Sequence, residues 1–373
     1  MINLKKTFRV LPIHLINPRI DRQIAVNLGE ELESLILTLG GTIVDRVIQK
    51  MVRPDPASYI GSGKIVQVSQ IIKDKRVDIV VLSSMAKPRQ KYVLQKDWIT
   101  VNPKIEIWDR VDLILHIFDI HARTVEAKLQ IELARMSYMG PRIYGMGFIL
   151  SQQGGGIGTS GIGETNTELM KRHWRNEIKK KTEELKKIEK NKEIQIVKRK
   201  QDGFKTVSIV GYTNAGKSSL FNVLTGKPAF IENVLFATLD SSVGKLYISE
   251  LQKDVLVTDT IGFIRNLPPH LIKAFKSTLL ESIYADLLLH VVDVSDPEWE
   301  VKILIVNEIL EELGRNLSDV IYIFNKTDLV TVDREKITQK FLQNTPIFIS
   351  TKNGEGIEEV KKTITQRFNR ETR

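Results

Sequence analysis

One stretch, residues 207–226, constrains the fold more than any other part of the chain. It reads VSIVGYTNAGKSSLFNVLTG: an apolar run, a glycine-rich turn and then a helical pattern. The turn contains Gly211, Gly216, Lys217 and Ser218 in the spacing G-x4-G-K-S, the complete Walker A pattern. Glycines let backbone amides approach phosphate groups, and the N-terminus of the helix adds positive potential. The stretch therefore predicts an α/β domain that binds phosphate between a strand and a helix.

Two side chains of this turn have defined chemical tasks. Lys217 is expected to neutralise charge on the β- and γ-phosphates, which makes it a candidate catalytic residue. The Ser218 hydroxyl is expected to ligate Mg²⁺. The candidate nucleotide contacts of the turn are Gly211, Tyr212, Thr213, Asn214, Ala215, Gly216, Lys217, Ser218 and Ser219.

A second motif lies in VLVTDTIGF, where an apolar strand ends in Asp259-x-x-Gly262. Asp259 is expected to hold Mg²⁺ through water, and the Gly262 amide to contact the γ-phosphate as a second candidate catalytic group. Between these two motifs, NVLFATLDSS at residues 233–242 is expected to be the mobile switch. Its Thr238 is the candidate catalytic hydroxyl that closes on Mg²⁺ and the γ-phosphate, and Phe236 is a further candidate nucleotide contact.

The third and fourth motifs select the base. VIYIFNKTDL is an apolar strand that ends in the pattern N-K-x-D, with Asn325, Lys326 and Asp328. The Asp328 carboxylate can accept hydrogen bonds from N1–H and the exocyclic amine of guanine, whereas adenine has neither donor there. The loop that closes over guanine is expected at Ser350, Thr351 and Lys352. The four motifs in this order predict a GTPase with GTP as substrate and GDP as product.

Two details of these motifs bear on the mechanism. Phe263 stands where many GTPases have a glutamine that orients the attacking water, and phenylalanine has no hydrogen-bonding group for that task. We therefore expect slow unaided hydrolysis that a partner, or another way of positioning water, completes. Asn214 resembles the phosphate-loop asparagine of potassium-activated GTPases, where the side-chain oxygen helps to hold K⁺ beside the phosphates. K⁺ is thus a candidate cofactor beside Mg²⁺, and the alternative is that Asn214 faces solvent.

The first 120 residues are expected to form a smaller α/β domain. Short β-rich runs alternate with helical patterns, the runs at 8–16, 41–49 and 77–84 and the patterns at 29–39 and 64–75. Within this part, YIGSGK at residues 59–64 imitates a phosphate loop but lacks the first glycine and the final hydroxyl residue of Walker A. We interpret it as a strand-to-helix turn, and a phosphate contact is the alternative.

Between these two domains, the sequence predicts a helical hairpin at residues 121–202. One helix is expected at 121–138, with an apolar stripe made of Ala122, Val125, Leu129, Leu133 and Met136. A longer helix is expected from about Thr165 to Lys200, with a stripe made of Trp174, Ile178, Leu185 and Ile188. The tip would be the glycine-rich stretch at 152–164. That stretch contains G-x-G-x-x-G without a βαβ setting, so we interpret it as a backbone-rich tip that approaches RNA, with a simple flexible linker as the alternative.

The chain of 373 residues is thus expected to contain three parts, at 1–120, 121–202 and 203–373, with no further domain after the last. Residues 1–202 carry 35 basic and 23 acidic side chains, whereas residues 203–373 carry 20 and 22. The hairpin alone has 17 basic and 10 acidic residues. Such a local excess is typical of a protein that binds a polyanion, and a merely solvated lysine-rich surface is the alternative.

Composition narrows the chemistry and the compartment. The chain has no cysteine, which excludes disulfides, thiol nucleophiles and cysteine-based zinc sites. Its N-terminus, MINLKKTFRV, has no apolar signal-peptide core, and no apolar stretch reaches the roughly 18 residues that a membrane helix needs. We therefore expect a cytoplasmic protein without a membrane span. We also expect it to be a monomer.

Together, these motifs resemble the HflX family of ribosome-associated GTPases, and the likeness extends over nearly the whole chain. VGYTNAGKSSLFNVLTG, LFATLD and DTIGFIRNLP are similar to the family's G-domain signatures, and GGGIGTSGIGET to its glycine-rich loop. The resemblance implies an N-terminal α/β subdomain, an antiparallel helical hairpin and a Ras-like P-loop G domain. It also implies binding to the large ribosomal subunit and its rRNA through the basic arm and the glycine-rich loop. Ribosome-stimulated GTP hydrolysis and a role in ribosome splitting, rescue or stress follow from the same resemblance.

The sequence differs from the usual family pattern at several positions. Family members commonly have Arg where Ser160 stands, Pro at Ile162 and Gln-Leu at Asn166-Thr167, and many carry an additional C-terminal domain. Two other functions remain open: an rRNA-binding assembly or silencing factor that uses hydrolysis only as a release timer, and an ATP-driven RNA remodeller that uses the first domain. The failed YIGSGK pattern argues against the second.

Overall fold

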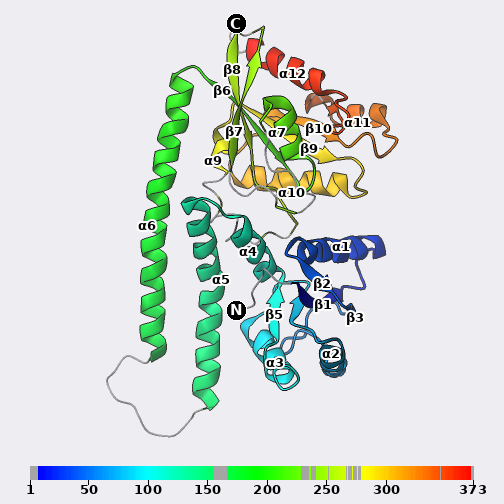
Figure 1. Ribbon diagram of the computed structural model, residues 1–373, viewed down its shortest axis with the longest axis vertical. Helices are drawn as coiled ribbons and strands as arrows, with labels where there is room; N and C mark the ends of the chain where they lie inside the picture. The colour runs from blue at the N-terminus through cyan, green and yellow to red at the C-terminus, as the bar shows by residue number, and fades with distance from the viewer. Residues whose placement is uncertain are drawn as a thin grey trace. The chain divides into compact units, whose positions relative to one another are not determined.

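The computed structural model describes residues 7–153, 166–227, 235–236, 241–250, 252–265, 267, 271, 275, 279–344 and 346–370 (Figure 1). The chain divides into two compact units. One unit comprises Met1–Ile120 and Ile131–Glu183, and the other comprises His121–Gln130 and Glu184–Arg373. Among the described residues, we find no helix with the length and hydrophobicity needed to cross a membrane.

The first unit contains a five-stranded sheet in which every pairing is parallel. Its strands are β1 (Phe8–Ile16), β2 (Gly41–Ile43), β3 (Val47–Lys50), β4 (Ile79–Leu82) and β5 (Glu106–Asp109). The single run expected at 41–49 is in fact two strands, because β2 pairs with the first half of β1 and β3 with its second half. On the other side of β1 lie β4 and then β5.

Three helices connect these strands, α1 (Arg22–Thr38), α2 (Ser62–Lys75) and α3 (Pro88–Trp98), and a fourth, α4 (Arg110–His121), follows β5. The core of the sheet includes Leu11, Val80 and Trp98, all of which are fully buried. The YIGSGK segment is confirmed as the turn into a helix, since Gly61 is the N-cap of α2. Tyr59 in that turn has a left-handed backbone and bonds Ser84 through its hydroxyl group.

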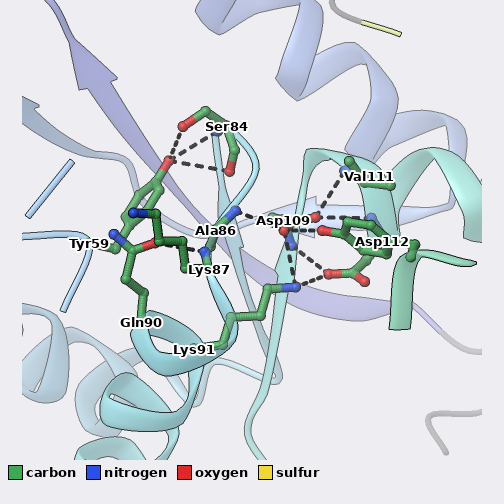
Figure 2. A network of polar contacts seen from close by, with 10 residues as sticks. Tyr59, Ser84, Ala86, Lys87, Gln90, Lys91, Asp109, Val111 and Asp112 are labelled. Atoms are coloured by element: carbon green, nitrogen blue, oxygen red, sulfur yellow. Dashed lines mark hydrogen bonds and ion pairs between the residues drawn. The ribbon is translucent and has the colours of Figure 1, made fainter. Parts of the chain in front are cut away.

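A polar network at the end of β5 fixes the first unit around one buried carboxylate (Figure 2). Asp109 is 0% exposed, and its Oδ1 accepts hydrogen bonds from the amides of Val111 at 3.0 Å and Asp112 at 3.2 Å. Its Oδ2 accepts from the Ala86 amide at 3.0 Å and from the hydroxyl of Tyr138, and Lys91 Nζ lies 3.3 Å away. Because these donors come from three separate segments, the carboxylate joins them into one rigid body.

Two long helices, α5 (Val125–Gln153) and α6 (Asn166–Gln201), form the predicted hairpin. Trp174 on α6 donates through Nε1 to the Met136 carbonyl on α5 at 3.1 Å. Further along α6, Lys181 pairs with Glu132 at 2.8 Å, and Lys192 pairs with Glu126 at 3.4 Å. Successive residues of α6 therefore meet earlier residues of α5, so the two helices run antiparallel.

The expectation that the first hairpin helix begins at residue 121 was wrong. Helix α4 ends at His121 and α5 begins at Val125, because the Thr124 hydroxyl accepts the Ala127 amide at 3.1 Å and caps a new helix. Ala122 therefore does not belong to α5, and Val125 is 71% exposed rather than buried. The remainder of the two predicted stripes is buried or half-buried, namely Leu129, Leu133, Met136, Trp174, Ile178, Leu185 and Ile188. Most of the predicted glycine-rich tip, residues 154–164, lies outside the described residues.

The second unit contains a six-stranded sheet with the order β11-β10-β9-β6-β8-β7. Its strands are β6 (Lys205–Gly211), β7 (Ser242–Ile248), β8 (Lys253–Asp259), β9 (Leu287–Asp293), β10 (Val320–Asn325) and β11 (Ile347–Phe348). Among the described strands of this sheet, the pairing of β7 with β8 alone is antiparallel. Chain order reverses at β6, whose neighbours are β8 and β9, and such a point is where open α/β sheets bind ligands.

The described residues of this unit include the helices α7 (Lys217–Thr225), α9 (Leu280–Tyr284), α10 (Trp299–Glu312), α11 (Arg334–Lys340) and α12 (Ile357–Arg370) (Figure 1). Short 3₁₀ turns lie at Leu317–Asp319 and Leu342–Asn344. One apolar cluster joins Phe221 of α7 and Ile364 of α12 to inward-facing strand residues such as Val257 and Ile323. The predicted fold class, a small α/β part, a helical hairpin and a P-loop G domain, is confirmed.

Candidate nucleotide-binding site

The sequence motifs meet at one edge of the second sheet. Gly211 ends β6, Asp259 ends β8 and Asn325 ends β10. These three strands run parallel within one sheet, so their carboxyl ends lie at the same edge. The loops that follow these strands, together with the loop after β11, bring the four motifs together.

The loop after β6 has a backbone that only glycine fits at two positions. Gly216 has a φ of +96°, and a Cβ there would lie 2.2 Å from Asn325 Nδ2. Gly211 has a φ of +151°, and a Cβ there would lie 2.3 Å from the Val291 carbonyl oxygen. Asn214, also left-handed at 62°, is exposed. The loop therefore packs closely against Asn325 and Val291, while Asn214 faces outward.

Lys217 is buried at the start of α7, and its Nζ donates to the Tyr212 carbonyl at 2.8 Å. Burial lowers the pKa of Lys217 to about 8, an effect that the nearby Asp259 carboxylate partly opposes. A buried ammonium is costly without a compensating anion. An incoming phosphate oxygen would supply that anion, so the position suits a phosphate-binding lysine.

The two candidate magnesium ligands on these strands and loops lie together. Ser218 Oγ donates to Asp259 Oδ2 at 2.6 Å, and the carboxylate is fully buried. Hydroxyl and carboxylate oxygens are suitable ligands for Mg²⁺, and the ion usually keeps waters and substrate phosphates as its other ligands. In the described part of the chain, no group of three or more acidic or histidine side chains could hold a metal on its own. The residues therefore fit an ion that arrives with a phosphate.

The loop after β8 is joined to the phosphate loop. The Phe263 amide donates to the Gly211 carbonyl at 3.1 Å, and the Thr213 amide donates to the Phe263 carbonyl at 2.8 Å. The Phe263 side chain is 1% exposed. A Cβ on Gly262 would lie 2.8 Å from Thr213 Cγ2 and 3.0 Å from Lys217 Nζ, so a side chain here would crowd both residues. The sequence position that carries glutamine in many GTPases is thus an anchored, buried phenylalanine.

Asn325 links the phosphate loop to the loop expected over the base. Its buried amide donates through Nδ2 to the Ala215 carbonyl at 2.8 Å and accepts at Oδ1 from the Thr351 amide at 3.1 Å. Asp328 is exposed, and its Oδ1 accepts from the buried Ser350 hydroxyl at 2.7 Å. Lys352 is exposed beside them. The bond from Ser350 therefore fixes one oxygen of the Asp328 carboxylate beside the loop after β11.

Comparisons with known proteins identify the family. Three family models match the chain: one described as GTP-binding GTPase N-terminal at residues 27–119, one as GTP-binding GTPase Middle Region at 121–199, and one as 50S ribosome-binding GTPase at 206–326. The protein named GTPase HflX from Caldanaerobacter subterraneus subsp. tengcongensis is 42% identical over 342 residues, which covers 92% of this chain and 77% of that one. The chain belongs to the HflX GTPase family.

Other HflX relatives and solved structures agree with this assignment. The HflX protein of Escherichia coli K12 is 35% identical over 344 residues, covering 92% of this chain and 79% of its own. A GTP-binding protein from the archaeon Sulfolobus solfataricus, solved in complex with GDP, is 25% identical with a TM-score of 0.51 and covers 97% of this chain and 99% of that one. A structure described as the SsGBP and GDP complex reaches 27% identity and a TM-score of 0.55, covering 97% and 98%. The predicted family and the predicted enzyme class, a GTPase, are confirmed.

Within this HflX chain, some predicted site residues have surroundings that the sequence did not anticipate. Tyr212 is buried, its hydroxyl accepts from the Arg265 amide at 2.7 Å, and Lys302 Nζ lies 4.7 Å from its ring centroid. Ser219 is half-buried in the first turn of α7, Phe236 is buried with a left-handed backbone, and Thr351 is half-buried. Thr238 lies outside the described residues, together with most of the predicted switch.

Sequence reasoning missed Asp293, which ends β9 and pairs with Lys326 of the N-K-x-D motif at 2.6 Å. Lys326 has a left-handed backbone, with a φ of 67°, and this ion pair holds its side chain at the edge of the site. The sequence contains a pattern that could have indicated Asp293, because LLLHVVD is an apolar strand that ends in a carboxylate, as VLVTD does.

Proposed function

We propose that the chain binds GTP and GDP with Mg²⁺ at the edge formed by the ends of β6, β8 and β10, and hydrolyses GTP there. The observation that carries this proposal is the convergence of the four motifs. Lys217 lies beside Gly262, Ser218 bonds Asp259, and Asn325 connects the phosphate loop to the loop after β11. An HflX GTPase needs one place where phosphate, metal and guanine contacts meet, and this edge brings candidates for all three together.

Each residue has a task in this proposal. Lys217 would neutralise charge on the β- and γ-phosphates, and the Gly262 amide would contact the γ-phosphate. Ser218 and Asp259 would hold Mg²⁺, which supplies charge neutralisation on the phosphate oxygens when bound. Thr238 is a further candidate for this ion and for the γ-phosphate. Because Phe263 cannot orient water, we expect slow hydrolysis by the isolated protein and faster hydrolysis with a partner.

Asp328 is the residue proposed to choose guanine. Its carboxylate would accept from two guanine donors, while the Ser350 hydroxyl holds Asp328 Oδ1 in place. In Asp328→Asn the new amide would face a donor of guanine with a donor of its own. We expect weaker GDP binding and stronger xanthosine diphosphate binding in a titration with both nucleotides. Asp319→Asn, at an exposed carboxylate of the same unit, serves as the matched control and should change neither affinity.

We propose further that the protein acts on the large ribosomal subunit in the cytoplasm, as a monomer that contacts rRNA through its basic arm and glycine-rich loop. The charge supports this partner, since 35 basic and 23 acidic residues occur in residues 1–202. The family model matched at 206–326 is described as a 50S ribosome-binding GTPase, which names the same partner. Contacts to phosphates would make binding fall steeply as salt increases.

Co-sedimentation with ribosomes tests this partner. We expect the protein to pellet with large subunits in the presence of a non-hydrolysable GTP analogue and much less with GDP. Lys186 and Lys187 are exposed on α6, so the double change of both to Glu should weaken pelleting severalfold. The matched double change of Lys336 and Lys362, exposed on α11 and α12, should weaken it far less. Separated subunits after mixing with intact ribosomes would support splitting, and intact occupied ribosomes would support a silencing or assembly factor instead.

K⁺ is the second cofactor that we propose. Asn214 lies within the phosphate loop, where it is exposed and has a left-handed backbone, so its side-chain oxygen is available to an ion that also touches phosphate. We expect faster GTP hydrolysis in KCl than in NaCl. Asn214→Gly keeps the left-handed backbone and removes the amide oxygen, so it should abolish the difference between the two salts. Equal rates of the unaltered protein in KCl and NaCl would contradict the proposal.

A further inference from the structure

Thr213 carries a buried hydroxyl whose hydrogen bonds are not satisfied by the described protein. The residue is 7% exposed, and within the described part of the chain its Oγ1 has no hydrogen-bond partner. A buried hydroxyl without a partner costs about 1–3 kcal/mol. Thr365 on α12 provides a contrast, because it is also 7% exposed but donates its hydroxyl to the Lys361 carbonyl at 2.8 Å. Valine has nearly the same shape as threonine and would avoid this cost, so packing does not explain the hydroxyl.

The surroundings place Thr213 at the terminal-phosphate end of the proposed site. A Cβ on Gly262 would lie 2.8 Å from Thr213 Cγ2, 3.0 Å from Thr213 Cα and 3.0 Å from Lys217 Nζ. Thr213, Gly262 and the lysine ammonium therefore surround one point. Gly262 and Lys217 are both candidates for contact with the γ-phosphate, whereas the guanine loop begins at Asn325 and Ser350.

The backbone around Thr213 is held firmly. Its amide donates to the Phe263 carbonyl at 2.8 Å, and the Phe263 amide donates to the Gly211 carbonyl at 3.1 Å. Phe263 thus uses its backbone to fix the loop while its side chain stays 1% exposed. A buried phenylalanine thus stands where many GTPases have a residue that orients water, and its backbone is bonded to Thr213, whose hydroxyl has no partner among the described residues.

We propose that Thr213 is a catalytic residue whose hydroxyl contacts the terminal phosphoryl group of GTP and the water that attacks it. A hydroxyl can donate one hydrogen bond and accept others, so it can donate to a phosphoryl oxygen and accept from the water. The water oxygen bonds to the γ-phosphorus as the bond to the β–γ bridging oxygen breaks. The phosphate product keeps the water oxygen and one of its protons, the bridging oxygen stays on GDP, and the second proton passes to solvent. The inference rests on the nucleotide site proposed above.

The test uses the full chain with three variants: Thr213→Val, Thr213→Ser and the control Thr365→Val. In Thr213→Val we expect GTP hydrolysis under single-turnover conditions to slow by about 100- to 1,000-fold, the range for one lost hydrogen bond to the transition state. GDP affinity should stay within about twofold, because GDP lacks the terminal phosphate. Thr213→Ser keeps the hydroxyl and should retain most of the rate. Thr365→Val should leave the rate unchanged and reduce stability, whereas Thr213→Val should not reduce it.

Two outcomes would overturn the inference. Hydrolysis by Thr213→Val at the rate of the unaltered protein would show that the hydroxyl has no role. Equal losses in Thr213→Val and Thr213→Ser would assign the effect to packing. A further variant, Lys217→Ala, tests the nucleotide site independently of Thr213, and it should lose guanine nucleotide binding. If that variant binds GDP normally, the proposed site is wrong, and if it does not while Thr213→Val hydrolyses normally, only this inference falls.

Discussion

Asp109 and Asp259 occupy similar places in the two sheets, yet their surroundings differ. Each is the last residue of a strand, β5 or β8, and each is fully buried. Asp109 is held by the amides of Ala86, Val111 and Asp112, by the Tyr138 hydroxyl and by Lys91. Asp259 accepts from the hydroxyl of Ser218 in the phosphate loop. A buried carboxylate at a strand end therefore has a structural role when its hydrogen-bond donors come from the surrounding scaffold. When its donor comes from a phosphate loop, the carboxylate is a candidate metal ligand.

The largest expected effect comes from removing the charge of the scaffold carboxylate. In Asp109→Asn one side-chain oxygen becomes a donor that faces other donors, and Lys91 loses a buried counter-ion. We expect the first unit to lose about 3–5 kcal/mol of unfolding free energy. Urea unfolding followed by tryptophan fluorescence measures this, since Trp98, Trp108 and Trp174 all lie in that unit. A variant as stable as the unaltered protein would break the comparison.

The matching change in the second sheet should affect catalysis instead. Asp259→Asn removes a proposed magnesium ligand while keeping its volume, so we expect GTP hydrolysis to slow by about 100-fold or more. Its unfolding free energy should change by less than about 1 kcal/mol, because burying an amide is less costly than burying a carboxylate. Hydrolysis at several Mg²⁺ concentrations gives the measurement. A large loss of stability with unchanged hydrolysis would show that both carboxylates serve the scaffold.

A smaller effect should follow when one donor to Asp109 is removed. Tyr138→Phe deletes the hydroxyl that bonds Asp109 Oδ2 and leaves the aromatic ring in place. We expect the first unit to lose about 1–2 kcal/mol, less than in Asp109→Asn, because four donors remain. Tyr247→Phe, at a residue that is 58% exposed in the second unit, is the control and should change stability by less than about 0.5 kcal/mol. Equal stabilities of the two variants would remove Tyr138 from the network.

The smallest expected effect is a change in proton binding at Lys217. Burial lowers the pKa of Lys217 from 10.5 to about 8, so between pH 8 and 10.5 the unfolded chain holds more protons than the folded one. In this window the lysine makes the folded state more stable as the pH rises. Phosphate would raise the pKa again, so GDP binding at pH 8 should take up about half a proton, and at pH 7 about a tenth. Calorimetric titrations in buffers of different ionisation enthalpy measure this uptake, and none at pH 8 would contradict the assigned pKa.

The G domain was predictable from sequence because each of its motifs is contiguous and follows an apolar strand. Gly216 illustrates this, since the pattern requires glycine and the structure has Asn325 Nδ2 2.2 Å from the place of a Cβ. Assignment to HflX was also possible from the motifs, and it agrees with relatives that cover most of the chain. The roles of individual site residues remain predictions that the experiments above address.

Other features were not predictable because they depend on long-range contacts or on a single cap. The network around Asp109 uses Ala86 and Tyr138, which are 23 and 29 residues away in sequence. No local pattern connects such positions. The break before α5 depends on whether the Thr124 hydroxyl accepts an amide or faces outward, and a threonine within an apolar stripe allows either.

The amide of Asn325 has a kinetic consequence. Its Nδ2 donates to the Ala215 carbonyl, its Oδ1 accepts from the Thr351 amide, and the side chain is buried between the two loops. If either loop opens alone, a buried polar atom loses its partner, and that intermediate is penalised. The phosphate end and the guanine end should therefore open in one step. Release of a fluorescent GDP should follow a single exponential, and Asn325→Ala should split it into two phases as the loops open independently.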